Sequence, residues 1–182
     1  PLRVLAASKD AHAGKILPIL VETADPAAEI QVSVSGGAEF SEIRSQGLWE
    51  GMQVVRLKAG EAGPVFSVTL SSGGCRETVE IGRVVSHEDD NVLTGTSDTV
   101  YISQEDLPLM RDFMVWYLHH RLGNFITFRP VYRWTGGREL SPECWEKLRA
   151  LCEAMDLAYC HIIDGRELPG LNANPPLALL EG

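Results

Sequence analysis

The chain has 182 residues, of which 45% are hydrophobic and 23% are charged, a composition that predicts a packed protein and excludes a disordered chain. Its 25 acidic and 16 basic residues give a net charge of −9, which argues against a nucleic-acid-binding protein because phosphate contacts need clustered Lys and Arg. No apolar run approaches the roughly 20 residues that a membrane-spanning helix needs, so we expect no membrane partner.

Residues 1–86 show the pattern of short strands separated by turns. Apolar and polar residues alternate over Ile30–Ser35 and Val65–Leu70, as in strands that are buried on one face. Glycine-rich turns follow at 36–37 and 72–74. We therefore predict an antiparallel, immunoglobulin-like β-sandwich. Its strands are expected at Ile16–Thr23, Glu29–Ser35, Gln53–Lys58, Val65–Ser71 and Glu77–Val85.

The polar stretch 87–103 is expected to be a linker. Its acidic run, Glu88-Asp89-Asp90 followed by Asn91, offers oxygen ligands for Ca²⁺. The run lacks the alternate-residue spacing and the closing Glu of a calcium-binding loop. A solvated connector is therefore the better prediction, and we expect neither a metal nor another cofactor.

Residues 104–182 change to a helical period. Apolar side chains recur at three and four residues from Met110 to Leu118, and Gly123 follows as a C-terminal stop. A second helix is expected to begin after Ser141 as N-cap, with Pro142 in its first turn. The buried stripe of that helix is predicted to hold Trp145, Leu148, Leu151, Cys152 and Met155.

Two strands, Asn124–Tyr132 and Ala158–Ile163, are expected to alternate with these helices. Helix, strand, helix, strand with short connections is typical of a parallel sheet. Two strands alone leave both sheet edges unpaired, and a closed (β/α)₈ barrel needs about 250 residues. The second half is thus predicted to be an incomplete α/β segment, so that the fold class is a two-part α+β. This segment either packs against the sandwich or opens a truncated barrel.

The layout resembles secreted multidomain glycoside hydrolases, in which an accessory sandwich precedes a (β/α)₈ barrel. The resemblance rests on residues 123–130 and on Ala158–Glu167, taken as the first two barrel strands. It implies a fragment of a secreted or cell-surface carbohydrate-active protein that is inactive alone. The alternative is a non-catalytic module for carbohydrate binding, adhesion or another interaction, in which Trp49 would be the residue to test.

A candidate binding site lies at the carboxyl ends of the two predicted parallel strands, where such folds bind ligands. Arg129 and Arg133 share strand parity, and their guanidinium groups match carboxylate or sulfate, which suggests an anionic sugar. Tyr132 and Trp134 are neighbours in sequence and could stack on a sugar ring. His161 belongs to the same predicted set, although a core or hydrogen-bonded imidazole is the simpler interpretation.

Asp164 and Glu167 are the candidate catalytic acids of this site, and Arg166 between them is a candidate substrate-binding residue. Two carboxylates about 5–9 Å apart could serve as acid and nucleophile or base in glycoside hydrolysis. The alternative is that they form ion pairs with the arginines. The unpaired edge of the α/β segment also suggests a homo-oligomer.

The cysteines and the paired histidines are expected to be structural. Cys144 and Cys152 would lie about 12 Å apart along one helix, too far for a disulfide, so both are predicted to be buried apolar side chains. His119 and His120 would point about 100° apart on a helix, which favours a surface role over metal chelation.

Overall fold

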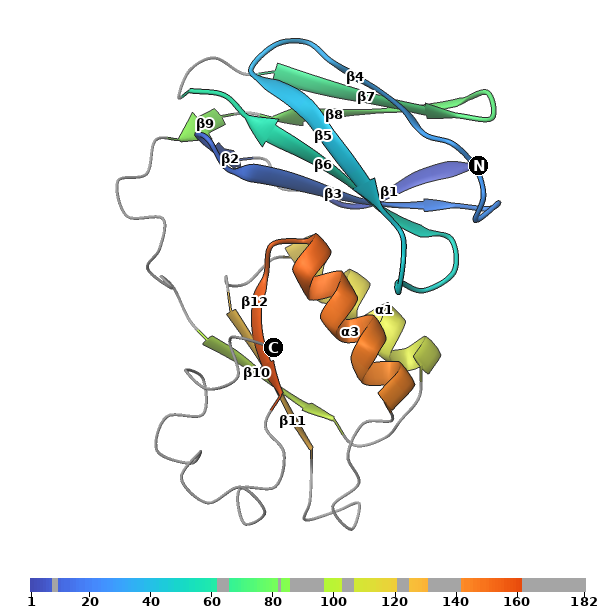
Figure 1. The fold of residues 1–182 in the computed structure, drawn as a ribbon, viewed down its shortest axis with the longest axis vertical. Coiled ribbons are helices and arrows are strands. Elements are labelled where there is room, and N and C mark those ends of the chain that lie inside the picture. Colours follow the sequence, from blue (N-terminus) through green and yellow to red (C-terminus); the bar gives the residue numbers. More distant parts are fainter. Residues whose placement is uncertain are drawn as a thin grey trace.

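The computed structural model describes residues 1–7, 10–61, 66–81, 83–85, 97–102, 107–120, 125–130 and 142–161. Figure 1 shows a β-sandwich in the upper part of the molecule, with two helices and a small parallel sheet beneath it. One sheet of the sandwich faces these helices, and we call it the inner sheet. The other is the outer sheet.

The inner sheet has four antiparallel strands in the order β1-β3-β6-β5. They are β1 (Leu2–Ala7), β3 (Ile16–Thr23), β6 (Met52–Ala59) and β5 (Ala38–Arg44). In β3 and β6 almost every residue is buried, because one face of the sheet packs on the outer sheet and the opposite face packs on the helices. The continuous apolar runs in these two strands have this cause.

The outer sheet has three antiparallel strands in the order β4-β7-β8. They are β4 (Gln31–Val34), β7 (Phe66–Ser72) and β8 (Cys75–Ile81). In β7 buried residues alternate with half-buried Ser and Thr, as expected for a strand with one covered face. Two short strands, β2 (Asp10–His12) and β9 (Arg83–Val85), pair in parallel. The predicted antiparallel sandwich is therefore confirmed.

The second half contains a parallel sheet in the order β10-β11-β12, with α1 and α3 between successive strands in the chain. Its elements are β10 (Ser97–Ile102), α1 (Leu107–His120), β11 (Phe125–Pro130), α3 (Pro142–Ala154) and β12 (Ala158–His161). The parallel pairing expected of the last two strands is present. β10 was not predicted, because it falls in the stretch that was expected to be a linker. Its apolar residues are confined to the C-terminal half of the strand, so the sequence shows no alternation.

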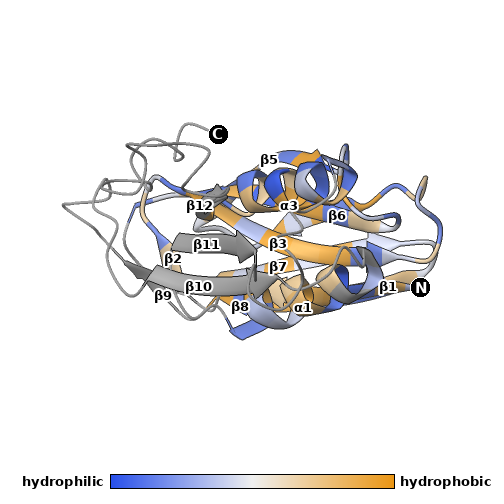
Figure 2. Ribbon diagram, turned by 90° about the horizontal axis from the view of Figure 1, so that it is seen from below, coloured by the Kyte–Doolittle hydropathy of each residue, from blue (hydrophilic) through white to orange (hydrophobic). Residues whose placement is uncertain are grey.

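Two apolar cores hold these layers together. The first lies between the inner and outer sheets and includes Ile19, Val55 and Leu70. The second lies between the inner sheet and the two helices and includes Leu20, Val54 and Leu148. Seen from below, β3 passes as a largely apolar strand behind α1 and α3 (Figure 2). We call α1 and α3 together the helical layer.

The second half thus packs against its own sandwich, which is one of the two arrangements that the sequence left open. The other arrangement, the opening of a (β/α)₈ barrel, has no support among the described residues, which form a three-stranded parallel sheet. The helices bury their apolar faces against the inner sheet, and β10 pairs with β11, so the expected two-stranded parallel sheet has a third strand.

Candidate functional site

The junction between the inner sheet and the helical layer is an apolar interface with the packing of a core. Met110, Met114 and Tyr117 of α1 and Leu148 and Leu151 of α3 are all buried in it. The predicted burial of Cys144 and Cys152 is confirmed, and neither of these two described cysteines is joined in a disulfide.

Trp49 belongs to the same interface and is only 7% exposed. Its proposed use as the binding residue of an adhesion module is therefore wrong. The segment Leu48-Trp49 leads into β6, and the indole joins the core because the helices cover that end of the inner sheet.

A β-bulge in β1 adapts the edge of the inner sheet to α1. The pairing with β3 shifts between Val4 and Ala6, so Leu5 and Ala6 both face the helical layer although they are adjacent in sequence. The Leu5 carbonyl oxygen accepts a hydrogen bond from His119 Nδ1 at 3.2 Å. His119 and His120 are both exposed, as predicted.

The C-terminus of α3 ends in a Schellman motif. Asp156 has φ of 53°, the amide of Asp156 donates to the Glu153 carbonyl at 3.2 Å, and the amide of Leu157 donates to the Cys152 carbonyl at 2.9 Å. Glycine is the usual residue at this left-handed position because it has no Cβ. An aspartate here indicates that its side chain has a use.

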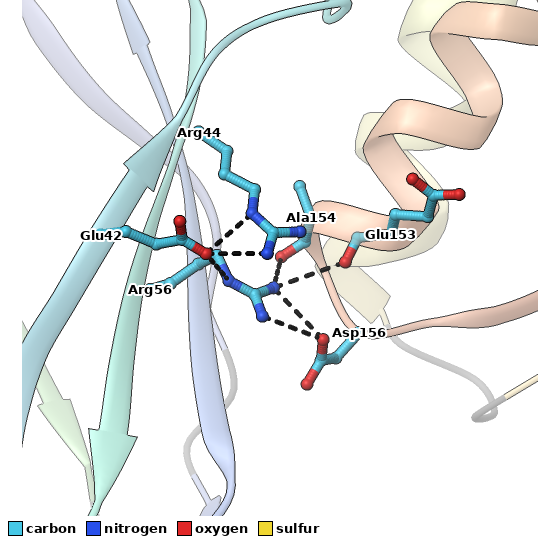
Figure 3. Close-up of polar contacts among 6 residues, drawn as sticks. All are labelled: Glu42, Arg44, Arg56, Glu153, Ala154 and Asp156. Atoms are coloured by element: carbon cyan, nitrogen blue, oxygen red, sulfur yellow. Dashed lines mark hydrogen bonds and ion pairs between the residues drawn. The ribbon is translucent and has the colours of Figure 1, made fainter.

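That use is a contact with Arg56 of β6 (Figure 3). The Arg56 side chain is only 7% exposed, and both of its terminal nitrogens donate to Asp156 Oδ1 at 3.2 Å. One of them also donates to the carbonyl oxygens of Ala154 and Glu153. A guanidinium therefore occupies the end of α3 where helix carbonyls and the helix dipole favour a cation.

The opposite side of the guanidinium faces β5. Glu42 is the direct cross-strand partner of Arg56, and Arg56 Nε lies 3.1 Å from Glu42 Oε1. The Nε–H is not directed at that oxygen, so the contact is an ion pair without a hydrogen bond. Arg44 shares the same carboxylate at 2.8 Å (Figure 3). Arg56 thus connects β5, β6 and the end of α3.

Two further polar contacts tie the helices to the inner sheet. Arg111 of α1 forms an ion pair with Glu22 of β3, and Glu22 also pairs with Arg3 of β1 at 2.7 Å. Lys147 of α3 donates to the Leu48 carbonyl at 3.3 Å. Arg3, Glu22 and Arg111 are more exposed than Arg56, so their ion pairs lie at the rim of the junction.

The outer face of α1 carries an aromatic group, which we call the platform: Phe113, Trp116 and His120. Trp116 is 51% exposed. The His120 ring lies 4.8 Å from the Trp116 ring, and the Phe113 ring lies 6.1 Å away on the other side. His120 Nδ1 donates to the Trp116 carbonyl oxygen at 2.8 Å, which fixes the imidazole beside the indole. Asp112, four residues before Trp116, lies on the same helix face.

The described titratable groups include one strongly shifted thiol. Burial raises the pKa of Cys152, and the negative charge of Glu153 raises it further. A thiol with a raised pKa stays protonated and is a poor nucleophile, so Cys152 has a packing role. Within the described ranges, no three His, Cys, Asp or Glu residues come together as metal ligands. The described helices include none that is long and apolar enough to cross a membrane.

Two open hollows lie at opposite ends of the sandwich. One, of about 740 Å³, is lined partly by Arg3, Glu22, Glu50 and Glu77. The other, of about 680 Å³, is lined mainly by small residues around Gly37 and Gly60. At Gly37 a Cβ would lie 2.6 Å from the Phe66 ring, so only glycine allows the backbone to approach Phe66 this closely.

Most residues of the predicted sugar site lie outside the described residues: Tyr132, Arg133, Trp134, Asp164, Arg166 and Glu167. The backbone places Arg129 in β11 and His161 in β12. His161 is the register partner of Phe128, so the two predicted residues lie one position apart on neighbouring strands. The acidic run 88–91 also lies outside the described residues.

The sequence reasoning did not single out Trp116 or Arg56. Trp116 lies between the positions of the apolar stripe of α1. A tryptophan that lies outside the buried stripe of a helix could have been recognised from the sequence as an exposed aromatic residue. Arg56 is a charged residue within an apolar strand, which indicates a paired guanidinium at a covered sheet face.

No protein-family model matches the chain, and no curated protein is similar to it in sequence. Among solved structures, domains 4 and 5 of the S-layer protein SbsC share 16% identity at a TM-score of 0.38, over 47% of this chain and 51% of that one. Tandem immunoglobulin repeats of Dlar share 14% identity at a TM-score of 0.33, over 58% of each chain. The Lin-41 filamin domain shares 13% identity at a TM-score of 0.33, over 46% of this chain and 91% of that domain.

The expected resemblance to secreted multidomain glycoside hydrolases is wrong. Solved structures that this chain resembles include S-layer, immunoglobulin and filamin domains, and the described residues form a β-sandwich and a three-stranded parallel sheet. The two strands taken as the start of a barrel are the second and third strands of a small parallel sheet.

Proposed function

We propose that this chain is a non-catalytic interaction module of the adhesion type, and that it binds a carbohydrate chain through the platform on α1. The observation that carries the proposal is Trp116, a large aromatic side chain that is half exposed and is held between two other rings. A fixed indole offers a flat apolar face at low entropic cost, and such a face suits the apolar side of a sugar ring.

Polar groups flank the indole along the helix. Asp112 precedes Trp116 by four residues and His120 follows it by four, so each lies about 6 Å along the helix axis from the tryptophan. A carboxylate accepts hydrogen bonds from hydroxyl groups, and so does Nε2 of a neutral His120, whose Nδ1–H already donates to the Trp116 carbonyl. Stacking on Trp116 combined with hydrogen bonds on both sides is a chemistry that suits a glycan better than an apolar ligand.

The helical layer gives the platform a rigid base. Met110, Met114 and Tyr117 bury α1 against the inner sheet, and Phe113 of the platform is itself partly buried against that core. The platform rings therefore need little ordering when a ligand arrives. We also propose a secreted or cell-surface location, where an adhesion module would meet its glycan.

A glycan array followed by titration calorimetry tests this function. We expect the wild-type chain to bind a subset of glycans, and Trp116→Ala to weaken that binding about tenfold or more, since truncation of a central aromatic anchor costs about 2 kcal/mol or more. Phe40→Ala is the matched control, because Phe40 is 48% exposed on β5 and lies outside the platform.

Two results would contradict the proposal: no glycan binding by the wild-type chain, or binding that Trp116→Ala leaves unchanged. Binding to a protein partner that depends on Trp116 would keep the interaction module and remove the carbohydrate. Trp49→Ala is unsuitable for this test because its loss would damage the core.

A further inference from the structure

We propose that the contacts of Arg56 with Asp156 and with the last carbonyls of α3, which we call the latch, make the sandwich and the helical layer unfold as one cooperative unit. The inference is independent of the proposed function. It concerns whether the two halves of the chain can open separately, as modules joined by a connector do.

The first argument is the position of Arg56. It lies within β6, a strand paired on both sides in the inner sheet, and its side chain is almost fully buried. Its donors reach Asp156, a residue 100 positions later in the chain. A separation of the two halves would break these contacts together.

The second argument is what each side would lose. The Schellman motif satisfies the carbonyls of Cys152 and Glu153, but the Ala154 carbonyl receives its donor from Arg56. If the helical layer moved away, α3 would lose a charged donor, and the guanidinium would keep Glu42 while losing Asp156. Loss of a hydrogen bond to a charged group is more costly than loss of a neutral one.

The third argument is the residue at position 156. A glycine would adopt its left-handed conformation with less strain, yet the position holds an aspartate whose carboxylate pairs with Arg56. The strain is local to the end of α3, whereas the ion pair acts across the junction. The aspartate therefore serves the contact between the halves more than it serves the helix.

The test follows unfolding of the full chain in urea with one probe in each half. Labelling of the buried thiols Cys144 and Cys152 reports on α3, and peptide-resolved hydrogen exchange of β7 reports on the sandwich. In the wild-type chain, both probes should change at the same urea concentration. In Arg56→Met, labelling of the two thiols should begin at lower urea and run at least about tenfold faster, while β7 keeps its protection.

Arg44→Met is the matched control, because Arg44 pairs with Glu42 and is much more exposed than Arg56. We expect it to leave the two probes together. The latch is overturned if the wild-type probes already separate, or if Arg56→Met shifts both probes equally.

Asp156→Gly and Asp156→Asn keep the inference testable if Arg56→Met fails to fold. Both remove the carboxylate and retain a residue that tolerates the left-handed conformation. Separation of the two probes in either variant supports the latch. Coincident probes in both variants overturn it.

Discussion

The inner and outer sheets consist of similar strands, yet they differ in how many faces are covered. Five consecutive residues of β3, from Leu17 to Val21, are buried. In β7, Phe66, Val68 and Leu70 are buried while the residues between them are not. The difference arises because the helical layer covers the second face of the inner sheet, whereas none of the described residues of the outer sheet packs in the core with the helices. The apolar pattern of a strand therefore reports how many of its faces are covered.

The uncovered face of the outer sheet is rich in hydroxyl groups. Ser35 and Ser67 lie 3.0 Å apart between Oγ atoms, and Thr69 and Thr78 lie 3.4 Å apart between Oγ1 atoms. Cross-strand hydroxyl pairs stabilise a solvated sheet face modestly and leave it hydrophilic. An introduced aspartate should therefore be tolerated on this face and should destabilise the helix-facing side of the inner sheet.

The largest expected effect is that of a charge in the junction. Val54 is fully buried between β6 and the helical layer, so Val54→Asp would bury a carboxylate without a partner. The cost of several kcal/mol is comparable with the total stability of a domain, about 5–15 kcal/mol, and we expect loss of the near-ultraviolet circular dichroism signal. Ser33→Asp, on the exposed face of β4, should change stability by less than about 0.5 kcal/mol. Equal thermal midpoints for the two variants would contradict a covered inner sheet.

Substitutions that create a cavity on either side of the inner sheet should have the next largest effect on stability. Leu20 faces the helical layer, Leu70 lies between the two sheets, and both are fully buried. We expect Leu20→Ala and Leu70→Ala each to lower the free energy of unfolding by about 2–5 kcal/mol, measured in urea. A loss below about 1 kcal/mol for Leu20→Ala alone would mean that the junction is packed more loosely than the sandwich.

The smallest expected effect distinguishes two turns. Gly51 precedes β6 of the inner sheet and Gly73 joins β7 to β8 of the outer sheet, with φ of 83° and 54°. Alanine adds about 1–2 kcal/mol of strain at either position. At Gly51 its Cβ would also lie 2.8 Å from the Thr23 carbonyl oxygen, whereas at Gly73 nothing lies within 4 Å. Gly51→Ala should therefore be the less stable variant by roughly 1 kcal/mol in thermal unfolding, and the reverse order would show that the turn before β6 can relax.

Strands that are central or regular could be predicted from the sequence. The segment Ile16–Thr23 forms β3 with the expected bounds, and alternation identified β4 and β7. The edge strands β1 and β5 were missed for a physical reason. Each contains a bulge that interrupts the alternation, and β5 is mostly exposed and charged, as edge strands often are.

The candidate site was less accessible to sequence reasoning. Arg56 gains its role from Glu42 across a strand pair and from Asp156 at the end of a helix, and neither partner is adjacent to it in the chain. Trp116 could be placed on α1 by periodicity, but its exposure depends on which face the inner sheet covers. The arginine and carboxylate set around Arg129 and Asp164 stays a prediction.

The order of layers along the chain has a consequence for biosynthesis. The ribosome delivers the strands of the inner sheet well before α1 and α3, which follow about 50 residues or more after β6. Until both helices have emerged, Leu20 and Val54 have no cover, and such a nascent surface promotes aggregation. The helix-facing side of the inner sheet can therefore be buried only after α1 and α3 have been synthesised.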